Sequence, residues 1–234
     1  MVFRAAYLVT AVVHLTALLL NYLSLGDFSL VVFISKPLLM PLLMIHYLQA
    51  SAQLRRPAGW ALPISLIFSF GGDVLLMLGT LEALKSYMVL LFLSGLVSFL
   101  IAHVCYILEF AKDQTQGKSL LRRRPLWLIP FLLVYAAFMN FIIPNMEYAF
   151  IFPVVVYGGV LTTMVVAAFN RKGKVNALSF WLVFIGALTF YLSDSMIAID
   201  RFYHSFQLAP LAIMTTYLTA QYLIVIGLLR RVDY

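Results

Sequence analysis

The chain has 234 residues, of which 64% are hydrophobic and only 11% are charged, and its mean hydropathy is +1.00. A soluble domain of this length cannot bury that much apolar surface, so the composition predicts an all-α protein with several membrane-spanning helices. The apolar runs are continuous and about twenty residues long, which excludes a β-barrel, and the net charge of +7 lies mostly in the connections between them, which argues against a nucleic-acid partner.

Hydropathy predicts eight membrane-spanning helices that form a single domain over residues 1–234. In chain order, the predicted spans cover residues 5–25, 28–49, 60–80, 86–110, 126–143, 148–169, 177–199 and 206–229. The first apolar run follows Arg4, but it is longer than the apolar part of a signal peptide and has no convincing small-residue cleavage site. We therefore interpret it as the first span. The single cysteine, Cys105, excludes an internal disulfide and a cysteine metal cluster.

The distribution of basic residues predicts the orientation of these spans. With eight spans, one side of the membrane receives thirteen lysine and arginine residues: Arg4, Arg55, Arg56, Lys112, Lys118, Arg122, Arg123, Arg124, Arg171, Lys172, Lys174, Arg230 and Arg231. The other side receives only Lys85 and Arg201. This bias predicts cytoplasmic termini, and we interpret the Arg122–Arg124 run as part of it rather than as a site for anionic head groups. The short connections suit a bacterial inner membrane or, in a eukaryote, the endoplasmic reticulum membrane.

Two aspartates, Asp73 and Asp194, lie deep inside apolar runs, whereas most other acidic residues fall in short connections that water can reach. An acid near the middle of a bilayer costs a few kcal/mol or more and by default indicates a functional site. Each aspartate follows an interfacial tryptophan, Trp60 or Trp181, by thirteen residues. At about 1.5 Å per residue, both carboxyl groups are expected roughly 20 Å from the same interface.

Other polar residues are expected at similar depths. Lys36 and Tyr217, counted from the ends of their helices, reach the layer of the two aspartates, and His103 and Gln221 form a second layer one or two turns deeper. A lysine at this depth is expensive unless it is paired, and a carboxylate is its natural partner. Ser69 precedes an aspartate by four residues and therefore shares its helix face.

Each of these residues also has a purely structural interpretation. The two aspartates and Lys36 can form a buried polar clamp between helices, and His103 can be a core histidine bonded to a backbone carbonyl. Tyr217 and Gln221 can simply join helices through hydrogen bonds. No G-x-S-x-G motif supports a serine hydrolase, and the four histidines are scattered singly, so we expect neither a metal nor another cofactor.

Five short motifs in chain order give the sequence a recognisable pattern. They are Lys36-Pro37, Gly72-Asp73, Gly95…Phe99…His103…Tyr106, Ser193-Asp194 and Thr216-Tyr217…Gln221. In this pattern the chain resembles the YhhN-like membrane proteins, which include the animal lysoplasmalogenases. It departs at Leu218, where relatives often carry a second tyrosine. The resemblance implies hydrolysis of the vinyl ether bond of a lysoplasmalogen to a fatty aldehyde and glycerophosphoethanolamine or glycerophosphocholine, and it adds Tyr106 to the supporting residues.

This chemistry suits the residues. Hydrolysis of a vinyl ether begins with slow proton transfer to carbon and passes through an oxocarbenium ion that water captures. The first step needs a general acid, and a second carboxylate stabilises the cation or activates water. Asp73 and Asp194 are therefore predicted to be the catalytic pair, with the roles of the two unassigned. His103, Tyr217 and Gln221 would orient water, the substrate oxygen or the head group. Lys36 and Ser69 are predicted to be supporting residues of the same site.

A second interpretation comes from a different class of protein. Intramembrane acids also occur in proton and substrate pathways, so an acid–lysine relay fits a small transporter or a lipid-binding membrane protein. The Gly-Asp and Ser-Asp elements around Asp73 and Asp194 lie four spans apart, as in a faint parallel repeat. Turnover by purified protein in detergent, where no transport occurs, separates the two classes.

Overall fold

The structure, a computed structural model, describes residues 2–52, 59–113 and 120–231. In these residues all regular structure is helical, and eight helices are long and apolar enough to cross a membrane. The prediction of an all-α membrane protein with eight spans is confirmed. Arg55, Arg56 and Lys118 lie outside the described residues, and the cytoplasmic position of both termini stays a prediction.

The chain divides into two compact units, residues 1–105 and 106–234. The single domain expected from the sequence stays a prediction, because a division by contacts does not test whether the two units fold independently. The first unit contains α1 (Val2–Tyr22), α2 (Ser29–Ser51), α3 (Ala61–Leu78), the 3₁₀ helix η1 (Glu82–Tyr87) and most of α4 (Met88–Lys112).

The second unit begins within α4 and contains two pairs of long helices with short helical segments at their ends. These elements are α5 (Leu120–Arg123), η2 (Pro125–Leu128), α6 (Ile129–Ile142), η3 (Ile143–Asn145), α7 (Tyr148–Phe169), α8 (Ala177–Phe202) and α9 (Ala209–Leu229). The helices that cross the membrane begin and end within a few residues of the predicted spans.

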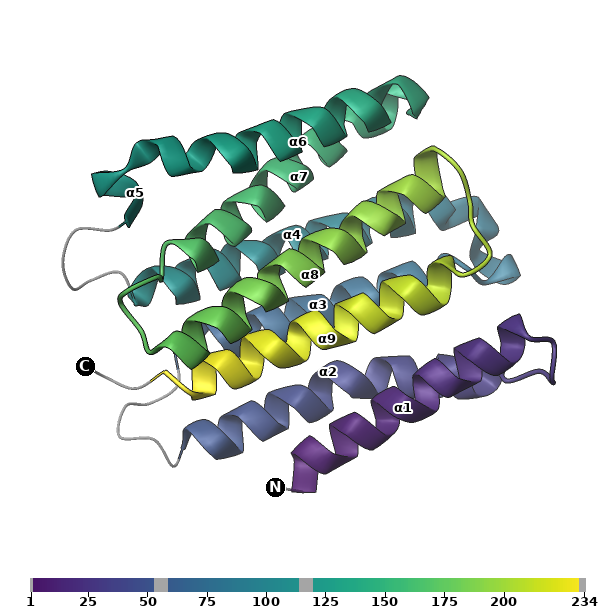
Figure 1. The fold of residues 1–234 in the computed structure, drawn as a ribbon. Helices are drawn as coiled ribbons and strands as arrows, with labels where there is room; N and C mark the ends of the chain where they lie inside the picture. Colours follow the sequence, from purple (N-terminus) through teal and green to yellow (C-terminus); the bar gives the residue numbers. More distant parts are fainter. Residues whose placement is uncertain (1, 53–58, 114–119, 232–234) are drawn as a thin grey trace. The chain divides into compact units, whose positions relative to one another are not determined.

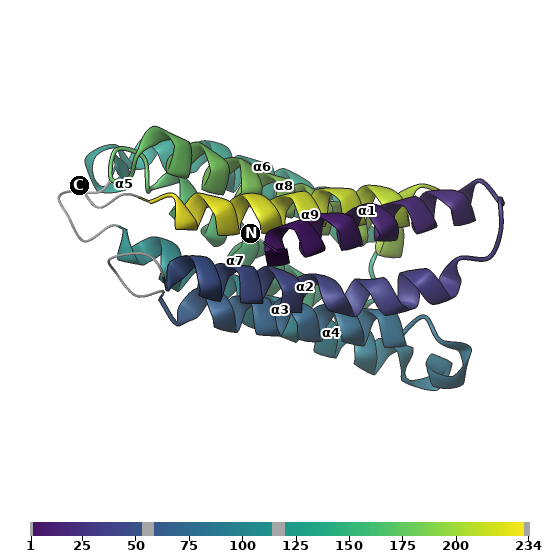
Figure 2. The same cartoon turned by 90° about the horizontal axis from the view of Figure 1, so that it is seen from below.

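Helices of the first unit pack along their small and polar residues. The helices α1 and α2 form an antiparallel hairpin (Figures 1 and 2), joined inside by a 2.8 Å hydrogen bond between His14 Nδ1 and Ser35 Oγ. The Ser98 hydroxyl on α4 donates to the carbonyl oxygen of Phe68 on α3 at 2.6 Å. Such interhelical bonds satisfy polar groups that lipid cannot.

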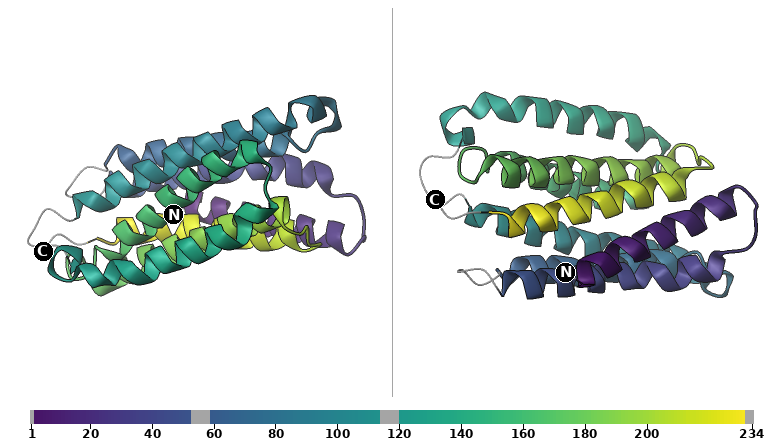
Figure 3. Two further views of the ribbon diagram at one scale, coloured as in Figure 1. Left: turned by 90° about the horizontal axis from the view of Figure 1, so that it is seen from above. Right: turned by 60° about the horizontal axis from the view of Figure 1, so that its bottom comes forward.

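In the second unit, α8 and α9 lie side by side (Figures 1 and 3). Two glycines allow the two helices to approach each other closely. A Cβ at Gly186 would lie 3.1 Å from the carbonyl oxygen of Ala220, and one at Gly227 would lie 2.7 Å from Cγ2 of Val183. The Asn176 side chain caps α8 by accepting the backbone N–H of Ser179 at 2.8 Å. This packing fixes α8, the helix that carries Asp194.

Buried ion pairs close one end of the second unit. The Arg171 guanidinium is fully buried and donates to Asp113 Oδ2 at 2.7 Å, while Arg231 contacts Glu109 at 2.7 Å and Asp113 at 3.4 Å. Lys112 completes the cluster with a 2.6 Å contact to Glu109. Burial lowers the pKa of Arg171, and the adjacent Asp113 carboxylate opposes that shift. Glu109 is fully buried and is an exception to the expectation that other acids face water.

Candidate active site

In the first unit, Asp73 lies beside a lysine from the neighbouring helix. Asp73 on α3 is only 4% exposed, and its Oδ1 lies 4.0 Å from Nζ of Lys36 on α2. The structure therefore brings together the deep lysine and one of the two predicted catalytic acids. The positive charge offsets part of the cost of placing a carboxylate among apolar side chains.

The backbone next to Asp73 fits closely against α4. A Cβ at Gly72 would lie only 2.4 Å from Cε2 of Phe99, so the ring occupies the space that a larger residue would need. His103 lies one turn beyond Phe99 on α4, and Ser69 lies one turn before Asp73 on α3; both are fully buried. The absence of a side chain at Gly72 thus allows the close approach of α4 to the helix that carries Asp73.

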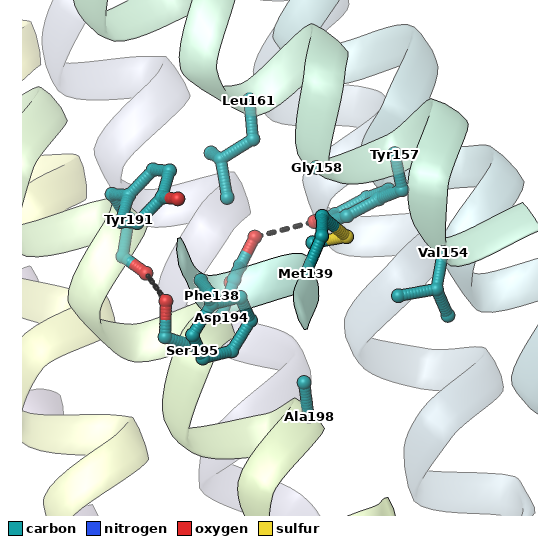
Figure 4. Close-up of a pocket in the computed structure, with 10 residues that line it drawn as sticks. All are labelled: Phe138, Met139, Val154, Tyr157, Gly158, Leu161, Tyr191, Asp194, Ser195 and Ala198. Atoms are coloured by element: carbon teal, nitrogen blue, oxygen red, sulfur yellow. Dashed lines mark hydrogen bonds between the residues drawn. The ribbon is translucent and has the colours of Figure 1, made fainter. Parts of the chain in front are cut away.

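In the second unit, Asp194 contacts a tyrosine that was not among the residues predicted from the sequence. The Tyr157 hydroxyl on α7 donates a hydrogen bond to Oδ2 of Asp194 on α8 (Figure 4). Tyr157 is 8% exposed, whereas Asp194 is half-buried. A hydrogen bond to a carboxylate is stronger than one between neutral groups and holds both side chains in a fixed geometry.

A small cavity lies against this pair (Figure 4). Its volume is about 30 Å³, and roughly 10–15 Å³ is sufficient for one water molecule. Side chains from α6, α7 and α8 line it: Phe138, Met139, Val154, Tyr157, Gly158, Leu161, Tyr191, Asp194, Ser195 and Ala198. The Asp194 carboxylate and the Tyr157 hydroxyl thus border a mainly apolar space large enough for a water molecule.

The remaining candidates of the second unit form a separate buried cluster. The Tyr106 hydroxyl at the end of α4 donates to Oε1 of Gln221 on α9. Phe190 packs edge-on against Tyr217, with ring centroids 5.5 Å apart, and against Tyr106 at 6.4 Å. The structure therefore brings Tyr106, Gln221 and Tyr217 together around one phenylalanine. Their contacts agree with the structural interpretation, in which polar side chains join helices.

The sequence contained a signal for Tyr157, although it was not used. Tyr157 is followed by Gly158 and Gly159, and a glycine pair also precedes Asp73. A polar side chain beside a glycine pair in an apolar helix indicates a place where another helix comes close. Among the described residues, no group of three histidine, cysteine, aspartate or glutamate side chains is placed to hold a metal ion.

Comparison with known proteins places this chain in a family. The sequence matches the YhhN family over residues 31–228, a range that includes both aspartates and Lys36. The chain belongs to the YhhN family. No solved structure gives a significant match.

Three mammalian relatives are similar over part of the chain. Lysoplasmalogenase TMEM86B of Homo sapiens is 31% identical over 139 residues, which cover 59% of this chain and 54% of the human protein. The protein of the same name from Mus musculus is 29% identical with the same coverage, and that from Rattus norvegicus is 30% identical over 140 residues. The matched segment spans about half the length of these relatives.

Proposed function

We propose that this protein is an intramembrane hydrolase that cleaves the vinyl ether bond of a lysoplasmalogen. The products are a fatty aldehyde and glycerophosphoethanolamine or glycerophosphocholine. The observation that carries the proposal is the Asp194–Tyr157 pair beside a water-sized cavity, within a chain related to proteins named lysoplasmalogenase. Hydrolysis requires a positioned carboxyl group and a place for water, and this region of the second unit offers both.

Asp194 is assigned the proton transfers. As a carboxylic acid it gives its proton to the outer carbon of the C=C–O group, and the electrons of the double bond form the new C–H bond. The resulting carboxylate then takes a proton from the water that attacks the oxocarbenium carbon, so the acid is restored. The hemiacetal formed in this way breaks its C–O bond to the glycerol oxygen. Its hydroxyl proton passes to that oxygen, which leaves as the alcohol, and the remaining carbonyl compound is the aldehyde. Tyr157 holds the carboxyl group in position through its hydroxyl.

Asp73 is assigned the stabilisation of the positive charge that develops on the substrate. A carboxylate near an oxocarbenium-like transition state performs this role in glycoside hydrolysis. Lys36, 4.0 Å from Asp73, offsets the negative charge of Asp73 before substrate arrives. The preorganised charge then acts at the moment when positive charge appears on the substrate.

The test is aldehyde release from a lysoplasmalogen by protein purified in detergent. Asp73→Asn and Asp194→Asn are each expected to lower kcat by roughly 100-fold or more. This is the usual contribution of an acid–base group, the role assigned to Asp194, and of a group that stabilises developing charge, the role assigned to Asp73. Asp200→Asn is the matched control, because Asp200 lies on the same helix as Asp194 and uses Oδ1 to accept from Ser205 and Phe206, which an asparagine oxygen can replace. Full activity of Asp73→Asn would remove Asp73 from the mechanism, and full activity of Asp194→Asn would remove Asp194.

The Lys36–Asp73 pair also fits the second candidate, a transporter or lipid-binding protein with an acid–lysine relay. Detergent separates the two functions, because no gradient exists there and only an enzyme releases product. Aldehyde release excludes a pure transporter. Its absence over a panel of ether lipids, with intact folded protein, favours the second candidate.

A further inference from the structure

Four basic residues gather where two connections meet at one end of the second unit. Arg122 and Arg123 end α5, Arg124 precedes η2, and Lys174 lies in the connection between α7 and α8. Burial lowers the pKa of Lys174, and repulsion from Arg123 and then Arg122 lowers it further. The connections are held together by Asn170, whose Oδ1 accepts the backbone N–H of Leu121 at 3.2 Å.

The acidic residues that lie near this end are already bound to other cations. Glu109 contacts Lys112 and Arg231, and Asp113 contacts Arg171 and Arg231. Within the described parts of the chain, no acidic side chain forms an ion pair with Arg123 or Arg124. The buried network therefore uses the local negative charge and leaves these two exposed guanidinium groups facing outward.

An open hollow lies directly beside these arginines. It is lined by Arg123, Arg124, Pro125, Leu126 and Trp127, and its volume is about 490 Å³. Leu126 is 74% exposed and Trp127 is 46% exposed, so the hollow has a charged wall and an apolar wall. The Trp127 ring packs 5.8 Å from that of Phe169 at the end of α7, which holds the apolar wall in place.

The sequence alone favoured a purely topogenic role for the Arg122–Arg124 run, but the hollow beside it adds an apolar wall to two of its charges. We propose that this hollow binds the head-group phosphate of an anionic phospholipid. Arg123 and Arg124 are placed to donate to the phosphate oxygens, because guanidinium groups bind phosphate with paired hydrogen bonds. Leu126 and Trp127 pack against the glycerol and the first methylene groups, at the depth where tryptophan is favoured in membranes. The exposed apolar wall favours an amphiphile over free phosphate, because free phosphate gains nothing from contact with leucine. None of the residues that line the hollow has a part in the proposed reaction.

The test compares two double variants that remove equal charge from the same end of the unit. Arg123→Gln/Arg124→Gln removes the proposed ligands, and Lys172→Gln/Arg230→Gln removes two exposed charges that do not line the hollow. Binding of phosphatidylglycerol and of phosphatidylcholine to purified protein is measured by native mass spectrometry. Each arginine contributes roughly fivefold to binding of an anionic lipid, so the first variant should lose about 25-fold in affinity for phosphatidylglycerol. The control should lose severalfold at most.

Three outcomes overturn the proposal. One is equal affinity of the unsubstituted protein for the anionic and the zwitterionic lipid. Another is an equal loss in the two double variants, which would show that only total charge matters. The third is displacement of the lipid by inorganic phosphate at equal concentration, which would assign the site to free phosphate. Equal melting temperatures of the three proteins establish that the comparison concerns folded molecules.

Discussion

Asp73 and Asp194 occupy the same position relative to a preceding tryptophan, yet their side chains meet different neighbours. Asp73 is 4% exposed and lies 4.0 Å from a lysine, next to a glycine against which a phenylalanine ring packs. Asp194 is half-buried, accepts a tyrosine hydroxyl and borders a small cavity. One acid is therefore next to a positive charge and the other next to a neutral donor and an open space.

An aspartate deep in an apolar helix, at the same distance from a tryptophan, therefore does not always have the same chemical role. Depth in the membrane sets the cost of a carboxyl group, but the groups within a few ångströms determine what it can do. A charged neighbour favours an electrostatic role, and a space for water favours proton transfer. Substitutions that change one neighbour at a time test this division of roles.

The largest effect on stability is expected for Lys36→Met. The substitution removes the cation beside the buried Asp73 carboxylate, and loss of one partner of a buried ion pair costs up to about 3–5 kcal/mol. Because the lysine side chain is 19% exposed and the separation is 4.0 Å, we expect about 2 kcal/mol of lost stability. We also expect a fall in kcat of at least tenfold. Thermal unfolding and aldehyde release in detergent measure the two effects.

The double variant Lys36→Met/Asp73→Asn separates the clamp from the catalyst. It carries no unpaired charge, so we expect it to recover most of the stability lost in Lys36→Met while staying inactive. Recovery of activity together with stability would show that the pair is only a structural clamp.

The close packing beside Asp73 predicts the next effect, for Gly72→Ala. A Cβ at this position would lie 2.4 Å from Phe99, and displacing a buried ring is expected to destabilise the protein by about 1–2 kcal/mol. The matched control is Gly159→Ala beside the Asp194 partner, where the nearest atom, the Tyr135 hydroxyl, would lie 3.8 Å away. There the gain in helix propensity should leave stability unchanged or slightly higher. Equal melting temperatures for the two variants would contradict this contrast.

The fold was largely predictable because membrane-spanning helices are a property of single segments. Their length and polarity follow from the thickness of the bilayer and the absence of water, so hydropathy predicts all eight. The burial of Glu109 was not predictable in this way. Its position near a helix end suggested that its side chain faces water. Its burial is explained by contacts with Lys112, three residues later in the same helix, and with Arg231 from a distant part of the chain.

Within the candidate site, only the charged residues inside apolar helices could be predicted from the sequence. A charge inside an apolar run is visible in the sequence, which is why Asp73, Lys36 and Asp194 were selected. Tyr157 was not selected, because a tyrosine in an apolar helix has a modest cost and many packing roles. Its pairing with Asp194 depends on the rotation of α7 against α8, which helix spacing does not determine. The same holds for the hydrogen bond between Tyr106 and Gln221.

A smaller effect on activity is expected for Tyr157→Phe. Phenylalanine keeps the ring, which is buried, and removes only the hydroxyl that positions the Asp194 carboxyl group. Asp194 becomes a carboxylate as it gives up its proton, and a hydrogen bond to a charged group is worth roughly 1.5–3 kcal/mol. Only part of this is gained in the transition state, so we expect kcat to fall about tenfold with KM nearly constant. An unchanged kcat would remove Tyr157 from the mechanism, and a change in KM alone would assign it to substrate binding. Tyr191→Phe, which alters another hydroxyl of the cavity lining, is the control.

The smallest effect is expected at an acid that lies in water, Asp27. Its Oδ1 accepts the backbone N–H of Ser29 at 3.0 Å at the start of α2, and the hydrogen bonds from Ser29 lower the pKa of Asp27 below its ordinary value of 3.8. Because the folded pKa is the lower one, the stabilisation is present above about pH 3.8 and is lost as the pH falls through the folded pKa. Asp27→Asn keeps the acceptor but removes the charge, so its melting temperature should be slightly below that of the unsubstituted protein at pH 6 and equal to it near pH 2. A difference in melting temperature that grows toward acid pH would contradict this pH dependence. A loss of aldehyde release by Asp27→Asn at pH 6 would show that activity depends on acids other than Asp73 and Asp194.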